Sequence, residues 1–392
     1  MRKLFLGGLL LLLLAGVAAG WWFWEAPILS PLTSSSSFRF LVGPDPSRTS
    51  GKIVYGFLPF WNVTKTTLQP ELTHLGYFSL TVDGDGSIIT QQDGGTEPGY
   101  GRLQSESFLE VMAAAEKTNA NLELVITQFE NDDIIALLSS KQAQSTLISE
   151  IDAVLLAYPF TGVNIDIEFT GEVTPTLRQN LVEFMSELNT HLDSKYTNMN
   201  LSIDMYSSAA TRDTLWDVAE INRYVDYIII MAYDFHFRGS SQAGPVAPLF
   251  GGKELWDSDI STHLKAYTQL VPSKKLILGV PFYGYSWQTT SDDSQANTFP
   301  RTGSTASFDR VQQLLLDPAI LNVQQKWNEK ALSPYITYEE DGETYVLYYE
   351  NSRSLSYKLD YVNQLNLGGI AIWALGYEGT SRELWDVISS KM

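Results

Sequence analysis

Short apolar runs alternate with longer amphipathic segments along the chain from Lys52 onward. Apolar runs of this length are typical of buried β-strands, and the segments between them have the apolar spacing of helices. In Thr176–His191, for example, apolar residues recur on one face of the expected helix. The pattern predicts eight strands, at Ile53–Phe57, His74–Ser79, Leu122–Gln128, Gly162–Glu168, Leu201–Met205, Tyr227–Tyr233, Leu276–Pro281 and Gly369–Trp373.

Eight strands joined by helical crossovers predict an α/β protein built on a closed (β/α)8 TIM barrel. A doubly wound open sheet is the alternative, but no glycine-rich phosphate loop follows the first strand. The stretch between the last two strands is too long for one helix. Within it, Tyr335–Tyr338 and Tyr345–Tyr349 flank a turn at Asp341-Gly342, which is the pattern of a hairpin. We predict a small α+β insertion at about residues 288–350, whose aromatic residues either line a cleft or only pack on the barrel.

The N-terminus has the pattern of a membrane segment. Arg2 and Lys3 precede the uncharged apolar run Leu4–Trp24, which is long enough to cross a bilayer and ends in an aromatic cluster. This pattern predicts a single-pass anchor over residues 1–24, with the N-terminus inside and the rest extracytoplasmic. A cleaved signal peptide, which would give a secreted protein, is the alternative. Residues 25–50 are rich in Pro, Ser and Thr and suit a linker to a domain spanning 51–392.

Composition narrows the classes of partner. The formal charge of −19 argues against nucleic acid, because phosphate neutralisation requires a basic surface. The absence of cysteine excludes disulfides and thiolate metal sites, and the four histidines lack metal-ligand spacing. We therefore expect no metal and no cofactor. We also expect a monomer.

The fourth predicted strand carries the most informative chemistry. In Gly162–Glu168, polar residues alternate with β-branched ones, so a strand sends Asn164, Asp166 and Glu168 to one face. Two carboxylates are costly to bury without partners, and they are what acid-catalysed bond cleavage requires. The alternative is an edge strand whose carboxylates are solvated.

The ends of three strands together resemble glycoside hydrolase family 18, the chitinase-like family. The family's fourth-strand pattern Asp-Gly-x-Asp-x-Asp-x-Glu is similar to Thr161–Glu168. Its sixth-strand Met-x-Tyr-Asp is matched at Met231, Tyr233 and Asp234, and its eighth-strand tryptophan at Trp373. The resemblance covers nearly everything from Lys52 to the C-terminus and implies a hydrolase of β-1,4 linkages next to N-acetylglucosamine.

The resemblance also implies roles for individual residues. Glu168 would be the general acid, and Asp166 would orient the acetamido N–H of a substrate whose own N-acetyl oxygen is the nucleophile. Tyr233 would hydrogen-bond the acetamido oxygen, and Trp373 would form the apolar floor under the sugar. The residues expected to bind substrate are Asn164, Met231, Asp234, Tyr283 and Trp373.

The chain departs from the family pattern in several places. Asn164 stands where an Asp is usual, and we expect its amide to donate to Asp166 and hold it ionised. Val125–Gln128 replaces the third-strand Ser-x-Gly-Gly, and Tyr283–Trp287 replaces an arginine-containing segment. These variants look more like the spore-cortex N-acetylglucosaminidase and chitobiase branch, which implies peptidoglycan or short N-acetylglucosamine oligomers as substrate.

The alternative to a hydrolase is a glycan-binding protein with weak or no catalytic activity. Chitinase-like lectins typically lose the acidic Glu, whereas Glu168 is present here, so the hydrolase is favoured. Phe60 and Trp61 follow the first strand and could stack on a sugar, although we expect them to pack in the core.

Overall fold

The computed structural model describes residues 51–392. The predicted membrane segment, Leu4–Trp24, lies outside the described residues. Within residues 51–392, no helix is both long enough and apolar enough to span a bilayer.

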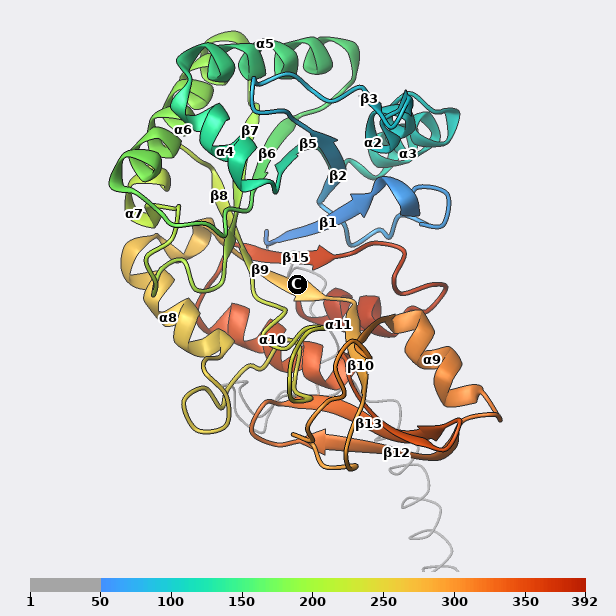
Figure 1. Cartoon of the computed structure of the whole chain (residues 1–392). Coiled ribbons are helices and arrows are strands. Elements are labelled where there is room, and N and C mark those ends of the chain that lie inside the picture. Colours follow the sequence, from blue (N-terminus) through green and yellow to red (C-terminus); the bar gives the residue numbers. More distant parts are fainter. Residues whose placement is uncertain (1–50) are drawn as a thin grey trace, which may run out of the picture.

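Eight parallel strands close into a barrel, which is the predicted fold (Figure 1). The strands occur around the barrel in the order β1-β15-β9-β8-β7-β6-β5-β2. Each of the eight predicted strands corresponds to one of them. Their bounds are β1 Ile53–Pro59, β2 His74–Thr81, β5 Asn121–Gln128, β6 Gly162–Ile167, β7 Asn200–Tyr206, β8 Tyr227–Met231, β9 Leu276–Pro281 and β15 Gly369–Trp373.

Helices cover the outside of the barrel, because the outward-facing residues of the strands are aliphatic and must be buried. On β6, for example, Val163, Ile165 and Ile167 are fully buried in the main core beneath the helices. The helix predicted at Thr176–His191 is α6, which runs from Pro175 to Lys195. The other covering helices include α3 (Glu106–Thr118), α4 (Asn131–Ser139), α5 (Lys141–Ala157), α7 (Val218–Ile221), α8 (Ile260–Leu270), α10 (Ser352–Gln364) and α11 (Glu383–Lys391).

A five-stranded antiparallel sheet lies between β9 and β15 along the chain. In Figure 1 it occupies the side of the molecule next to α10 and α11. The predicted hairpin is formed by its strands β13 and β14, and the sheet begins at Tyr283, before the predicted insertion. Its elements are β10 (Tyr283–Gln288), β11 (Ser304–Ser307), α9 (Phe308–Leu316), β12 (Leu321–Asn328), β13 (Ser333–Glu340) and β14 (Glu343–Tyr348).

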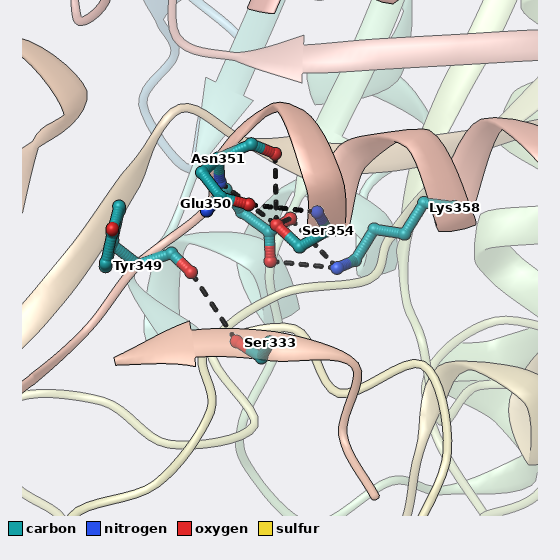
Figure 2. Close-up of polar contacts among 6 residues, drawn as sticks. All are labelled: Ser333, Tyr349, Glu350, Asn351, Ser354 and Lys358. Carbon is teal, nitrogen blue, oxygen red and sulfur yellow. Dashed lines mark hydrogen bonds and ion pairs between the residues drawn. The ribbon is translucent and has the colours of Figure 1, made fainter. Parts of the chain in front are cut away.

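A buried ion pair lies where the chain returns from this sheet to the barrel (Figure 2). The two carboxylate oxygens of Glu350, just after β14, accept hydrogen bonds of 2.8 and 2.9 Å from Lys358 Nζ on α10. Ser354 Oγ donates to the same carboxylate at 2.8 Å, and Asn351 and Ser354 form the capping box that begins α10. Glu350 is 2% and Lys358 0% exposed, so the pair connects the inserted sheet to the barrel without help from solvent.

Removing one partner of this pair should destabilise the protein, because the other is left uncompensated in the interior. We predict that Lys358→Met lowers the free energy of unfolding by about 3–5 kcal/mol. Removing both groups together, in Glu350→Leu/Lys358→Met, should recover much of this loss. Urea unfolding measures both changes.

Lys141→Met is the matched control, since Lys141 pairs with Glu183 and Glu187 on the surface. An exposed pair of this kind contributes less than about 1 kcal/mol. An equal loss of stability in the Lys358 and Lys141 variants would contradict the role of the buried pair.

Candidate active site

The alternation along β6 sends its polar side chains into the barrel. Asn164 and Asp166 are 0% and 3% exposed and lie on the face opposite the aliphatic residues. The strand ends at Ile167, one residue earlier than predicted, and Glu168 follows it directly. Glu168 therefore lies at the carboxyl ends of the strands, where the active sites of TIM barrels are found.

A cavity of about 380 Å³ lies at this end of the barrel. It is lined by side chains from the ends of several strands and from the inserted sheet, which contributes Tyr283, Tyr285 and Thr305. No aromatic residue within 288–350 lines the cavity: most pack inside the insertion, and Phe308 and Trp327 pack against the main core of the barrel. Seven of the eight predicted site residues line the cavity: Asp166, Glu168, Met231, Tyr233, Asp234, Tyr283 and Trp373.

Asn164 is the predicted site residue that does not line the cavity. Its Nδ2 donates 2.9 Å hydrogen bonds to Ser202 Oγ and to Asp204 Oδ1, both on β7. The expectation that this amide donates to Asp166 is therefore wrong. The two neighbouring inward positions of β7 are polar, and they take both hydrogens of the amide.

Glu168 has the environment of a general acid. Burial raises the pKa of its carboxyl, the nearby anion of Asp234 raises it further, and the Tyr206 hydroxyl opposes both by stabilising the ionised form. A carboxyl with a raised pKa keeps its proton closer to neutral pH, which is what proton donation to a leaving group requires.

Asp166 lies beside a second buried carboxyl. Burial raises the pKa of Asp166 well above its usual range, and the neighbouring Asp204 and Glu168 raise it further. Asp204 is 3% exposed and its pKa is also raised by burial, while the hydrogen bond from Asn164 lowers it. Burial and the charge of the neighbouring carboxyls therefore both favour a proton on this pair.

Tyr233 and Asp234 lie just beyond β8, which ends at Met231 and not at Tyr233 as predicted. Asp234 has a φ of 58°, a left-handed conformation that Asp tolerates better than most residues. Its Oδ1 accepts hydrogen bonds from the hydroxyls of Tyr283 at 2.5 Å and Tyr285 at 3.0 Å. Burial and nearby anions raise the pKa of Tyr233 well above its usual range, so its phenol remains a hydrogen-bond donor.

Aromatic rings form an apolar part of the cavity. Trp373, at the end of β15, packs edge-on against Phe78 with the ring centroids 4.6 Å apart. The Trp373 ring also contacts Phe57, with the ring centroids 5.8 Å apart. Trp61 lines the cavity with 41% of its surface exposed, so the expectation that it packs in the core is wrong. Phe129 is similarly exposed at the cavity.

Reasoning from the sequence missed two polar residues of the site, Asp204 and Tyr206. Both are on β7, where Ser202, Asp204 and Tyr206 alternate with aliphatic residues. This is the same period-2 pattern that singled out β6, so the signal was present. With this alternation, the polar side chains of both β6 and β7 face the interior of the barrel.

Comparison with known proteins agrees with this geometry. Residues 53–378 match the family described as glycosyl hydrolases family 18, and the chain therefore belongs to that family. The cortical fragment-lytic enzyme of Bacillus subtilis is 23% identical over 79% of this chain and 65% of its own length. Another Bacillus subtilis glycosylase is 26% identical, over 63% of this chain. That match spans 54% of the glycosylase, so the chain covers about half to two thirds of the length of these relatives.

Solved structures share the fold. The Group IV chitinase of Ostrinia furnacalis in complex with allosamidin superposes with a TM-score of 0.74 at 20% identity, covering 87% of this chain and 97% of that one. The spore cortex-lytic enzyme SleL of Bacillus megaterium superposes with a TM-score of 0.67 at 19% identity, covering 87% of this chain and 74% of that one.

The electrostatics of Glu168 give a prediction that does not require turnover. Tyr206→Phe removes a hydroxyl that stabilises ionised Glu168, so the pKa of Glu168 should rise further. Carboxyl ¹³C NMR titration measures this shift. Tyr224→Phe, a tyrosine outside the cavity, is the control and should leave the titration of Glu168 unchanged. A lower or unaltered pKa of Glu168 in Tyr206→Phe would show that the hydroxyl does not act on this carboxyl.

Proposed function

We propose that the protein is a retaining glycoside hydrolase that cleaves β-1,4 linkages next to N-acetylglucosamine. The observation that carries the proposal is the pair Asp166 and Glu168 at the end of β6, in a cavity with an aromatic wall. Membership of glycosyl hydrolases family 18 supports it. So does the relative named as a cortical fragment-lytic enzyme.

Glu168 starts the reaction as general acid. Its proton passes to the glycosidic oxygen as the bond between that oxygen and the anomeric carbon breaks. The carboxylate that results later takes a proton from the water that attacks the anomeric carbon, which regenerates the acid. The raised pKa of Glu168 favours the first step, and the Tyr206 hydroxyl favours the ionised form needed for the second.

The substrate supplies the nucleophile in this scheme. The oxygen of the N-acetyl group attacks the anomeric carbon and gives a cyclic oxazolinium-type intermediate, so configuration is retained after water attacks from the opposite face. Asp166 accepts the acetamido N–H and stabilises the positive charge that develops. The Tyr233 hydroxyl donates to the acetamido oxygen and holds it in line with the anomeric carbon.

The rest of the cavity holds the sugar ring. Trp373 provides a flat apolar surface, and aromatic faces of this kind bury the C–H face of a pyranose. Asp234 is fixed by the hydroxyls of Tyr283 and Tyr285 and presents an acceptor to sugar hydroxyls. Met231 fills the space at the end of β8.

Within this substrate class we propose peptidoglycan or short N-acetylglucosamine oligomers. The Asn-x-Asp-x-Glu form of β6 and the Tyr-Gly-Tyr form of β10 support this choice. Comparing the reducing ends released from purified peptidoglycan and from N-acetylglucosamine oligomers distinguishes the two.

Glu168→Gln keeps the shape of the side chain and removes its acidic proton. We predict that it lowers kcat on N-acetylglucosamine oligomers by at least about 10³-fold. Oligomer binding, followed by tryptophan fluorescence, should be retained. Glu172→Gln, an exposed residue four positions further on, is the control and should leave kcat unchanged. Undiminished hydrolysis by Glu168→Gln contradicts the assignment, and a wild type that binds oligomers without cleaving them favours a glycan-binding protein.

We also propose that the domain works outside the cytoplasm, tethered through Leu4–Trp24. The support is the length of the apolar run, the Arg2-Lys3 pair before it and the tryptophans that end it. Intact-mass analysis of membrane-associated protein should find residues 1–24 still attached. A mass that lacks them means that the segment is a cleaved signal peptide.

A further inference from the structure

Four polar residues inside the barrel form a chain that the catalytic scheme above does not use. Glu123 on β5, Asn164 on β6, and Ser202 and Asp204 on β7 are all buried, and Asp204 reaches the cavity floor. We call them the interior chain. Buried polar groups of this kind are costly unless they are paired. Their hydrogen-bond partners therefore indicate which groups donate a proton and which accept one.

The hydrogen bonds along the interior chain have a consistent direction. Ser202 Oγ donates to Glu123 Oε2 at 3.4 Å, and Glu123 also accepts a hydrogen bond from the Tyr227 hydroxyl. Because the one hydroxyl hydrogen of Ser202 is directed to Glu123, its oxygen is free to accept from Asn164 Nδ2. The other hydrogen of that amide then points at Asp204 Oδ1. Asp204 is thus held as the acceptor at the end of the chain.

Asp166 is the immediate neighbour of Asp204. The register between β6 and β7 pairs Ile165 with Ile203, so the next residues along each strand, Asp166 and Asp204, lie side by side at the cavity. Adjacent strands are about 4.8 Å apart, and the charge of Asp204 raises the pKa of Asp166, so the two carboxyls are close enough to interact.

The donors are divided unequally between these two carboxyls. Among residues 51–392, Asp204 receives the amide of Asn164, whereas Asp166 Oδ1 is buried and has no hydrogen-bond partner. The amide favours negative charge on Asp204, so a proton held by this pair is favoured on Asp166. A proton on Asp166 also turns an unpaired acceptor into a donor.

We propose that Asp204 is a positioning residue that shares one proton with Asp166 and takes it up when substrate binds. As Asp166 turns to accept the acetamido N–H, its O–H bond breaks and an O–H bond forms on Asp204, so the charge of the pair stays at −1. The inference rests on the proposed glycosidase activity. It places on β7 a carboxyl that resemblance to the family leads one to expect at position 164 of β6.

The pair does not titrate in isolation, because other ionisable groups face it from several strands. These groups are Tyr55, Glu123, Glu168, Tyr206 and Tyr233. Burial raises the pKa of Glu123 to about 7, so its own protonation is a separate event in the same range. Site-specific observation of Asp166 and Asp204 is therefore needed.

The test exchanges the carboxyl between the two strands. In Asp204→Asn, Asp166 loses its proton acceptor, and kcat should fall about 10²-fold with little change in KM. The swap Asn164→Asp/Asp204→Asn restores a carboxyl beside Asp166 from β6, and kcat should return to within about tenfold of the wild type, a strongly non-additive result. Asp193→Asn, on the exposed face of α6, controls for the change in charge and should be inert.

Two outcomes overturn the proposal in protein that remains folded. One is an Asp204→Asn variant with the wild-type kcat, and the other is a swap variant no more active than Asp204→Asn. A role in packing alone predicts the second outcome, because two substitutions then disturb the interior more than one.

A measurement without turnover separates this proposal from the proposed function. In ¹³C NMR titration of the wild type, Asp166 and Asp204 should hold one proton between them through neutral pH, and the loss of Asp204 should lower the pKa of Asp166. Two carboxyls that both ionise below neutral pH contradict the shared proton, whether or not the protein cleaves any glycan. A wild type without hydrolytic activity but with a shared proton overturns the proposed function instead.

Discussion

The removal of carboxyl groups from water is the constraint on which the site depends. Asp166 and Asp204 are each 3% exposed, and Glu168 lies beside them at the end of β6. A carboxylate in such surroundings is costly unless it is paired, so the group either neutralises or receives donors. The same desolvation raises the pKa of Glu168, which is what its proposed role as general acid requires. Burial of these carboxyls thus lowers the stability of the fold and, at Glu168, favours the protonated form.

The barrel makes this arrangement possible because it fixes polar side chains on rigid strands. The outward faces of the strands supply the apolar core beneath the helices, which leaves the inward faces free for Glu123, Asn164 and Ser202. These residues do not touch the cavity, yet they determine which donors reach the carboxyls that do. The inserted sheet completes the wall with Tyr285 and Thr305, and the buried pair of Glu350 and Lys358 connects that sheet to α10.

Much of this organisation could be read from the sequence, because it depends on local periodicity. The eight strands followed from the short apolar runs, and the polar face of β6 followed from the alternation of its residues. The site residues at the ends of β8 and β15 followed from the resemblance to family motifs. The hydrogen bond from Asn164 to Asp204 could not be predicted from local periodicity. Asp204 is 40 residues away, and the two meet only because closure of the barrel sets the register between β6 and β7. The exposure of Trp61 likewise depends on the path of the loop after β1, which periodicity does not encode.

In the proposed reaction the substrate's own N-acetyl group is the nucleophile, and Glu168 is the acid. The most direct measurement compares N-acetylglucosamine oligomers with fully deacetylated oligomers of the same length, while ¹H NMR records the anomer first released. If the N-acetyl group is the nucleophile, only the acetylated oligomers are cleaved and the β-anomer appears first. Cleavage of the deacetylated oligomers, or initial release of the α-anomer, would contradict it.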